Sequence, residues 1–347
     1  MNRSETDKPI TALLPEEIAR QVDMLPREGR QLYRWIHRKR IFDIAAMTDL
    51  SKALRNTLQE QDHLFALKLV EKQRSEKEGT SKVLLKCLDG EEIESVLLRH
   101  VGRVTFCLSS QAGCALNCSF CATGQSGFRR NLTTAEIVEQ ALHLAHLENL
   151  PENSTPNLVY MGMGEAFQNY EAVMNSIALL THPEGMGIGA RKITLSTAGD
   201  VPGIERFSEE PQQLRLSVSL HAADDELRSS LVPLNRRYPL KDLHRALQHY
   251  QERRSRQITI EWTLMKDIND SPAQAKQLVR FLEGLDAVVN AIPWNPVSGL
   301  PYAPSPGKAQ QAFIATLKQA GIKATLRRER GGDIDAACGQ LRLRHNS

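Results

Sequence analysis

From Arg103 onward the sequence alternates between short apolar runs and longer amphipathic stretches, and this alternation constrains the fold more than any other feature. The apolar runs predict six strands, at Arg103–Leu108, Asn157–Met161, Lys192–Ser196, Leu214–Ser219, Thr259–Leu264 and Ala287–Ile292. Helices are predicted between them, near Thr134–Leu147, Tyr170–Leu180, Leu240–Arg253 and Pro272–Leu285. A repeat of this kind implies an α/β fold with a parallel sheet, here curved into a partial barrel. Active sites of such folds lie at the carboxyl ends of the strands.

The segments on either side of this repeat have patterns of their own. Residues from about 13 to 67 predict short helices, and residues 82–99 predict a β-hairpin that turns at Asp89-Gly90. Gly307–Ala320 predicts a final helix and Lys323–Arg327 a final strand. We therefore expect a helical accessory domain (1–75), a β-hairpin extension (76–102), a partial (βα)6 barrel (103–300) and a carboxyl-terminal helix, strand and loop (301–347).

Composition indicates a globular protein of a reducing compartment. Of the 347 residues, 41% are apolar and 24% are charged, which is enough apolar material for a substantial core. No stretch approaches the roughly 20 apolar residues that span a bilayer, and the amino terminus lacks a signal-peptide pattern. The six cysteines are too few for a disulfide scaffold. We expect a cytoplasmic protein with no membrane segment.

The net charge of +3 does not by itself argue for a nucleic-acid partner, so the placement of basic residues matters more. A predicted helix over residues 30–40 carries four of them on one face: Arg30, Arg34, His37 and Arg38. Two interpretations remain open, a solvated surface and a face that contacts phosphates. The opposite face, with Leu32, Trp35 and Ile36, predicts a contact with the core.

The loop after the first predicted strand contains three cysteines, Cys114, Cys118 and Cys121, in the spacing C-x3-C-x2-C. Thiolates are ligands for iron–sulfur clusters and for zinc, and both sites usually take four protein ligands. Three together suggest a metal site with one position left open for chemistry. A zinc site would need a fourth ligand, and His143 and His146 lie in a helical pattern that predicts surface positions. We therefore favour a [4Fe–4S] cluster.

The C-x3-C-x2-C loop after the first strand of such a barrel resembles the radical S-adenosylmethionine (SAM) superfamily. The resemblance implies that the open iron binds SAM, whose reductive cleavage gives a 5′-deoxyadenosyl radical. Met161-Gly162-Met163-Gly164-Glu165 resembles the segment that contacts the methionine amino group, since a carboxylate suits an ammonium. The cofactor-binding residues implied by position are Gly164, Glu165, Ser196, Ser219, Leu220, His221 and Asn295.

Two further motifs resemble the RlmN and Cfr adenosine methyltransferases over nearly the whole chain. They are Ser109–Cys114 and the carboxyl-terminal string from Gly331 to Leu341, which contains Cys338. The resemblance implies that one SAM methylates Cys338 and that a second yields the radical, so two are used per turnover. It also implies that Cys107 resolves the covalent adduct with the base. The carboxylate that matches the family's proton acceptor is Glu94.

The same resemblance implies the substrate and partners, and it implies that the helical accessory domain (1–75) binds RNA. The expected target is carbon 2 of an adenosine at the peptidyl transferase centre of 23S rRNA, with the adenosine 3′ of the tRNA anticodon as a second candidate. Flavodoxin or ferredoxin is the expected reductant, and the protein is expected to be a monomer. Basic residues near the predicted barrel mouth are candidates for phosphate contacts: Arg129, Arg130, Arg327, Arg328 and Arg330.

Two alternatives to this function remain open. Ala166 resembles the Cfr branch, which would methylate carbon 8 of the same rRNA adenosine, whereas Pro293-Trp294-Asn295-Pro296 resembles RlmN, so carbon 2 is favoured. A non-catalytic, metal-bearing RNA-binding protein would need the three cysteines and the basic faces. It would not need Glu165, Asn295 or the pair Cys107 and Cys338.

Overall fold

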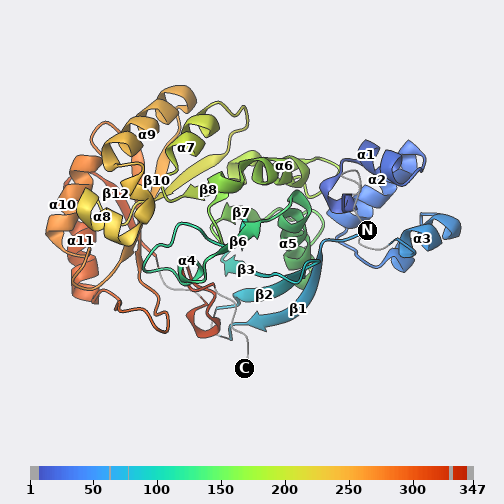
Figure 1. Ribbon diagram of the computed structural model, residues 1–347, viewed down its shortest axis with the longest axis horizontal. Coiled ribbons are helices and arrows are strands. Elements are labelled where there is room, and N and C mark those ends of the chain that lie inside the picture. The colour runs from blue at the N-terminus through green and yellow to red at the C-terminus, as the bar shows by residue number, and fades with distance from the viewer. Residues whose placement is uncertain (1–7, 62–63, 77, 328–330, 342–347) are drawn as a thin grey trace.

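Ten strands form one mixed sheet in the computed structural model, which describes residues 8–61, 64–76, 78–327 and 331–341 (Figure 1). The order across the sheet is β1-β2-β3-β4-β7-β8-β9-β10-β11-β12. The strands are β1 (Leu67–Arg74), β2 (Ser81–Cys87), β3 (Glu92–His100), β4 (Arg103–Cys107), β7 (Asn157–Tyr160), β8 (Ile193–Thr197), β9 (Arg215–Ser219), β10 (Ile258–Leu264), β11 (Ala287–Pro293) and β12 (Lys323–Leu326). A separate pair, β5 (Gln111–Gly113) and β6 (Phe128–Asn131), is antiparallel.

The six predicted barrel strands are confirmed as β4 and β7–β11, each paired in parallel with its neighbour. The predicted final strand is also confirmed, because β12 adds to β11 in parallel. The sheet begins at β1 and ends at β12, so it remains open, as expected of a partial barrel. In β10 apolar residues alternate with polar ones, and Ile258, Ile260, Trp262 and Leu264 are all fully buried. The residues between them include Glu261 and Thr263, which line a cavity on the other face of the strand.

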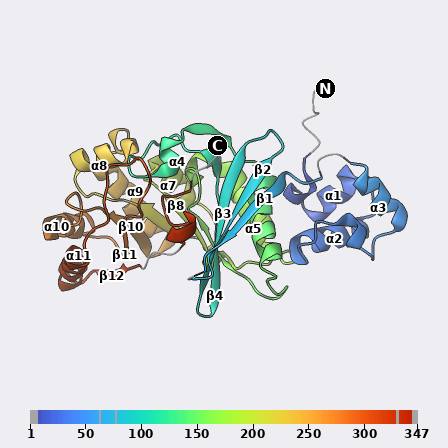
Figure 2. The same ribbon diagram turned by 90° about the horizontal axis from the view of Figure 1, so that it is seen from below.

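The helices that connect these strands surround the barrel part of the sheet, and α1–α3 form a separate group at the amino-terminal end (Figures 1 and 2). They are α1 (Pro15–Gln21), α2 (Pro26–Tyr33), α3 (Lys52–Gln59), α4 (Ala122–Gln125), α5 (Thr134–Leu147), α6 (Tyr170–Thr181), α7 (Val201–Ser208), α8 (Asp225–Leu231), α9 (Leu240–Arg254), α10 (Pro272–Phe281) and α11 (Gly307–Gln319). The predicted helix starts are confirmed: Thr133 and Glu136 form a capping box, and Ser271 caps α10 ahead of Pro272.

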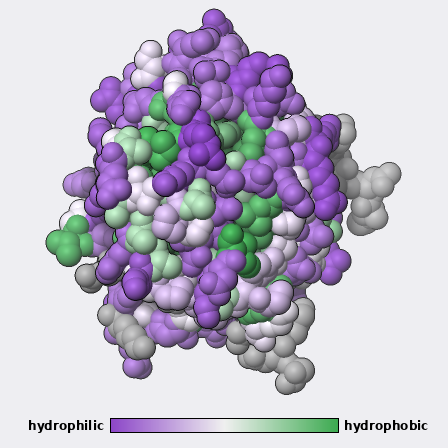
Figure 3. Space-filling model, turned by 90° about the vertical axis from the view of Figure 1, so that its left-hand side faces the viewer, coloured by the Kyte–Doolittle hydropathy of each residue, from purple (hydrophilic) through white to green (hydrophobic). Residues whose placement is uncertain are grey.

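The side of the molecule that carries α10 and α11 is mainly hydrophilic, with smaller apolar patches between (Figure 3). Each of these helices buries only part of its surface, with Ala275 and Leu278 buried on α10 and Phe313 and Leu317 on α11. This is the pattern of helices that cover a sheet on one side and meet solvent on the other. No helix in the described part of the chain is long and apolar enough to cross a membrane.

The predicted hairpin is present as β2 and β3, and a third strand that the sequence did not indicate joins it. β1 pairs antiparallel with β2, although residues 67–74 were grouped with the amino-terminal helices. Only Leu67 of β1 is buried, because this strand lies at the edge of the sheet. A strand with one buried residue has no clear alternation of apolar and polar positions, which is why its pattern was missed.

The amino-terminal basic helix has a surface that differs from the prediction. Residues 26–33 form α2, and a π-helical turn continues over Arg34–Arg38. His37, predicted on the basic face, is fully buried and stacks on Tyr33. Its three arginine neighbours each pair with a glutamate: Arg30 with Glu16, Arg34 with Glu184 and Arg38 with Glu152. The three arginines remain at the surface, as both interpretations of this face require, and only His37 departs from its predicted position.

Glu139 anchors the amino-terminal segment to the barrel. It is fully buried on α5 and accepts hydrogen bonds from the Thr11 hydroxyl (2.6 Å) and from the backbone N–H groups of Ala66 (2.8 Å) and Leu67 (2.7 Å). On the same helix His143 is buried against Phe42, with ring centroids 4.3 Å apart, so its predicted surface position is wrong. These contacts join segments more than 70 residues apart in the chain.

Replacing Glu139 with Gln should destabilise the fold by about 1–3 kcal/mol, because an amide offers one acceptor oxygen to three buried donors. The measurement is the free energy of unfolding in urea. The matched control is Glu171→Gln, which removes an exposed ion pair with Arg206 and should cost less than about 1 kcal/mol. Equal effects of the two substitutions would show that Glu139 is not an anchor.

Candidate active site

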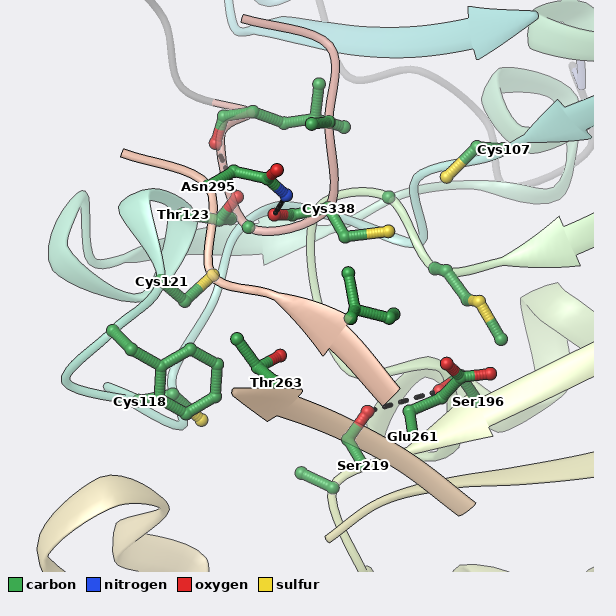
Figure 4. A pocket seen from close by; sticks show the side chains of 18 of the residues that line it. Cys107, Cys118, Cys121, Thr123, Ser196, Ser219, Glu261, Thr263, Asn295 and Cys338 are labelled. Atoms are coloured by element: carbon green, nitrogen blue, oxygen red, sulfur yellow. Dashed lines mark hydrogen bonds between the residues drawn. The ribbon is translucent and has the colours of Figure 1, made fainter. Parts of the chain in front are cut away.

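A cavity of about 430 Å³ lies inside the barrel and extends to the carboxyl ends of the strands. Five of the six cysteines line it: Cys107, Cys114, Cys118, Cys121 and Cys338. Figure 4 shows Cys338 on the same side of the cavity as Cys107, with Ser196, Ser219 and Glu261 on the other side. The remaining cysteine, Cys87, is buried in β2 and does not line the cavity. The fold therefore brings together thiols that are up to 231 residues apart, from Cys107 to Cys338.

The loop that carries Cys114, Cys118 and Cys121 is held by hydrogen bonds from several parts of the barrel. The Trp294 indole N–H donates to the Phe120 carbonyl (3.0 Å), and the Ser119 N–H donates to the Leu231 carbonyl (3.0 Å). A Cβ at Gly124 would lie 2.9 Å from the backbone nitrogen of Cys118, so only glycine lets the following turn fold back this tightly. The three thiols are thus presented to the cavity by a loop with a fixed path.

The chemistry and spacing of the three thiols fit a cluster better than a single metal ion. Among the described residues, no three Cys, His, Asp or Glu side chains converge closely enough to hold one ion. A zinc ion needs its ligands around a single point, whereas in a [4Fe–4S] cluster each thiolate binds a different iron. Burial raises the pKa of all three thiols, that of Cys114 to about 12. Their ionisation therefore depends on a cationic ligand.

Gly164 and Glu165 form a tight turn directly after β7. Gly164 has φ +100°, and a Cβ there would lie 2.5 Å from Cβ of Gln111, so no other residue fits without displacement. The Glu165 carboxylate accepts the N–H groups of Ala198 (2.8 Å) and Phe167 (3.2 Å). Burial raises its pKa to about 7, although these hydrogen bonds oppose the shift. A buried carboxylate at the cavity wall suits an ammonium group, because the positive charge would lower the pKa of Glu165 and keep it ionised.

The other predicted cofactor residues occupy different positions relative to the cavity. Ser196 and Ser219 line it with their hydroxyl oxygens 3.5 Å apart. Asn295 also lines it: its amide nitrogen donates to the Cys338 carbonyl (3.0 Å), and its buried amide oxygen has no hydrogen-bond partner among the described residues. His221 lines the cavity, but its Nδ1 accepts the Thr263 N–H (3.0 Å). Leu220 is fully buried and does not line the cavity.

Arg228 joins two of these strand ends and was not singled out from the sequence. Its guanidinium, almost fully buried, donates to the carbonyls of Ala198 (2.6 Å) and Leu220 (3.1 Å) and to the Asn235 amide oxygen (2.7 Å). Ala198 in turn donates its N–H to Glu165, so Arg228 holds the residue whose N–H binds this carboxylate. An arginine on α8 gives no sequence signal for such a role, because its acceptors are backbone carbonyls elsewhere in the chain.

Cys338 is exposed to the cavity, whereas the loop that carries it is hydrogen-bonded on its carboxyl-terminal side. The Ala122 N–H donates to the Gly339 carbonyl (2.8 Å), and the Gln340 amide donates to the Pro296 carbonyl (2.9 Å). Burial, together with the neighbouring Cys338, raises the pKa of Cys107 to about 12, and burial also raises the pKa of Cys338. Both thiols are therefore neutral at neutral pH, and both are free of disulfides.

Glu94 lies outside this cavity, in a neighbouring hollow under β1–β3. Its carboxylate is buried and pairs with Lys82 (3.0 Å), and Lys82 also donates to the Asp335 carbonyl (3.5 Å). The two spaces share a wall, because residues 333–335 line the hollow and residues 336–339 line the cavity. The structure therefore places Glu94 beside the loop that carries Cys338, without bringing it to the two thiols.

The arginines predicted near the barrel mouth differ in their availability. Arg130 forms ion pairs with Glu136 and Asp89. Arg129 is exposed and Arg327 lines the cavity, whereas Arg328 and Arg330 lie outside the described residues. Arg327 instead approaches Glu261 of β10, with 3.9 Å between Nη1 and Oε2. Glu261 also lines the cavity and was missed, because one acid in an apolar strand carries no positional signal.

The fold and the cysteine loop define a radical SAM protein, and a comparison with protein-family models agrees. Residues 108–279 match the model of the radical SAM superfamily. Membership of this superfamily implies a [4Fe–4S] cluster and SAM, which the three thiols and the strand-end groups could hold. A crystal structure of a radical SAM methyltransferase from Sphaerobacter thermophilus is 44% identical, with a TM-score of 0.92, and the match covers 98% of this chain and 99% of that one.

The comparisons also define the family within this class. Residues 21–64 match the model of the ribosomal RNA large subunit methyltransferase N-terminal domain. A probable dual-specificity RNA methyltransferase RlmN of Moorella thermoacetica is 46% identical over 96% of this chain and 97% of its own. The corresponding protein of Heliobacterium modesticaldum is 44% identical over 98% of this chain and 91% of its own. The chain belongs to the RlmN family of radical SAM RNA methyltransferases.

Replacing Arg228 with Lys should weaken SAM binding by about 10-fold, the usual order for a residue that positions a ligand-binding group. A single ammonium cannot reach three separate acceptors, so Ala198, and through it Glu165, loses this support. The measurement is SAM affinity by calorimetry on anaerobically reconstituted protein. Arg245→Lys, at an exposed pair with Asp242, is the control. Unchanged SAM affinity in the Arg228 variant would contradict this role.

Proposed function

We propose that this protein methylates carbon 2 of an adenine ring in 23S rRNA, at an adenosine of the peptidyl transferase centre, through a methylated Cys338. The observation that carries the proposal is the arrangement of five cysteines around one cavity. Three of them, Cys114, Cys118 and Cys121, lie on a single loop, and Cys107 and Cys338 line the same cavity beside each other. A metal-bearing binding protein would need the first three but would have no use for the other two.

The proposed mechanism divides the work between the cofactors and these two thiols. When bound, the cluster and two SAM molecules supply a methyl group and a carbon-centred radical, which is the chemistry that the polypeptide lacks. Cys338 accepts the methyl group and carries its carbon to the base through a covalent intermediate. Cys107 then forms a disulfide with Cys338 as the bond between the Cys338 sulfur and the methylene carbon breaks. The electron pair of that bond and a proton go to the carbon, which completes the methyl group and releases the base. Reduction of the disulfide restores both thiols.

A carbon radical is needed because the target is an sp² ring carbon. Such a carbon is a poor nucleophile, so direct transfer of a methyl cation from a sulfonium would fail, whereas a radical adds to it. The base must also leave its stack to reach thiols inside the barrel. The exposure of Cys338 to the cavity supports this role, since a buried thiol could not reach both a cofactor and a base.

Glu94 is the proposed proton acceptor. Its position beside the Cys338 loop supports a role in this step, but its carboxylate is paired with Lys82 in the neighbouring hollow. The role therefore requires residues 333–338 to move, so that the carboxylate meets the base adduct. The glycines that flank this loop, Gly331 and Gly339, both have positive φ and leave its ends conformationally permissive.

Further features of the proposal concern partners and specificity. The curated relatives are named dual-specificity enzymes, which supports a second RNA substrate, and we propose the adenosine 3′ of the tRNA anticodon. Their RlmN names favour carbon 2 over the carbon 8 that Cfr-like chemistry would modify. We also propose that flavodoxin or ferredoxin supplies electrons and that the enzyme is a cytoplasmic monomer.

The product tests the proposal directly. Reduced, reconstituted enzyme incubated with SAM and rRNA from a strain that lacks the modification should yield 2-methyladenosine after digestion and chromatography of the nucleosides. tRNA from the same strain should give the same product. 8-Methyladenosine would overturn the carbon assignment, and RNA binding without any methylated nucleoside would support the non-catalytic alternative.

Substitution of single cysteines should separate their roles. Cys338→Ala should abolish methylation and remove the methyl group that peptide mass spectrometry detects on residue 338. Cys107→Ala should leave RNA covalently attached to the protein, visible as a gel shift. Cys87→Ala should retain methylation of RNA and of Cys338, because Cys87 lies in β2, away from the cavity. Methylation of RNA by the Cys338 variant would contradict the proposed intermediate.

A further inference from the structure

Two charged side chains line the cavity without a place in the proposed mechanism. Glu261 lies in the middle of β10, where the strand register pairs it with Ser219 of β9 and Asn290 of β11. Arg327 directly follows β12, and its N–H donates to the Ala291 carbonyl (2.9 Å). Both line the cavity together with Cys107 and Cys338. They come from neighbouring parts of the sheet and face the same space.

The Glu261 carboxylate is only half satisfied. The side chain is 7% exposed, and its Oε1 accepts hydrogen bonds from the Ser217 hydroxyl (3.2 Å) and the Asn290 amide (3.1 Å). Its Oε2 is buried and has no hydrogen-bond partner among the residues that the structure describes. At 3.9 Å from Oε2, the Arg327 guanidinium attracts it without a hydrogen bond. A buried acceptor without a hydrogen bond costs folding free energy, so we expect a bound ligand to donate a hydrogen bond to it.

The pair also lies within electrostatic reach of the thiols that contact the base. Burial raises the pKa of Cys338, the Arg327 cation opposes this shift, and the Glu261 carboxylate adds to it. Arg327 likewise opposes the rise at Cys107. The pair therefore acts on the two thiols that the proposed function assigns to the base.

We propose that Glu261 and Arg327 bind the N6/N7 edge of the target adenine. This rests on the proposed function. The Glu261 Oε2 accepts a hydrogen bond from the exocyclic amine, and Arg327 donates to the adjacent ring nitrogen N7. Adenine presents one donor and one acceptor on this edge, whereas guanine presents two acceptors and would set its carbonyl oxygen against the carboxylate. The pair therefore selects adenine over guanine.

The same contact orients the ring for carbon 2. The N6/N7 edge and carbon 2 lie on opposite sides of adenine, so a base held by that edge points carbon 2 away from Glu261. Figure 4 places Cys107 and Cys338 across the cavity from Glu261. Carbon 8 is bonded to N7 and would face Arg327 instead. The pair thus determines which carbon meets Cys338, in addition to which base enters.

The experiment removes each partner of the two contacts in turn. rRNA fragments carry adenosine, purine riboside (no exocyclic amine) or 7-deazaadenosine (no N7) at the position that the wild-type enzyme methylates. Removal of the amine should lower kcat/KM of the wild type by about 10- to 100-fold, as expected for a hydrogen bond to a charged group. Removal of N7 should lower it by a similar factor.

Glu261→Met and Arg327→Met supply the protein side of each double-mutant cycle. The Glu261 variant should lose activity on adenosine but no longer distinguish adenosine from purine riboside. The Arg327 variant should no longer distinguish adenosine from 7-deazaadenosine. Comparing ratios cancels the intrinsic reactivity of each analogue, which is the same for every enzyme form. Ser217→Ala is the matched control, because it touches only the other carboxylate oxygen and should keep the preference for the amine.

The outcomes separate this inference from the proposed function. A wild-type enzyme that methylates purine riboside as fast as adenosine would overturn the inference and leave the proposed function standing. This comparison uses only the wild-type enzyme, so its result does not depend on whether a variant folds. Loss of RNA-independent methylation of Cys338, or of SAM affinity, in Glu261→Met would also overturn it, because the carboxylate would then serve the cofactor. If the wild type methylated no RNA, both proposals would fail.

Discussion

The site depends on the docking of the carboxyl-terminal loop against the cysteine loop. Ala122 and Thr123 donate to the carbonyls of Gly339 and Leu341, and Asn295 donates to the carbonyl of Cys338. The first two of these hydrogen bonds each close a separation of more than 200 residues. Without them Cys338 would have no fixed position relative to Cys107 or to the three metal-binding thiols. Because each acceptor is a backbone carbonyl, the docking depends on the path of the loop more than on its side chains.

A second constraint holds the strand ends on the other side of the cavity. Arg228 binds the carbonyls of Ala198 and Leu220, and Glu165 binds the Ala198 N–H. Ala198 is therefore held through both its N–H and its carbonyl. A charged side chain is expensive to bury, and three good acceptors are what make the guanidinium tolerable there. The arrangement gives the cavity a stiff wall against which small ligands can be oriented.

Much of the fold could be predicted because the barrel strands are strongly periodic and strongly apolar. The six strands, the capped starts of α5 and α10 and the hairpin at Asp89-Gly90 all carry local signals, in periodicity, capping residues or turn residues. β1 carries none, since an exposed edge strand buries too little to impose a pattern. His37 and His143 were placed on surfaces by helical spacing, although tertiary packing buries both. Spacing defines a face but does not say what covers it.

The sequence by itself determined the barrel, the cysteine loop and the family, because each rests on a local pattern or on a motif at a set spacing. Only the tertiary structure decided which residues share the cavity. It brought Cys107 to Cys338 and added Arg228, Glu261 and Arg327. It also placed Glu94 with Lys82 on the far side of the Cys338 loop. The reason is physical: these contacts join strand ends and loops that are distant in the chain, and their partners are often backbone groups that every residue carries.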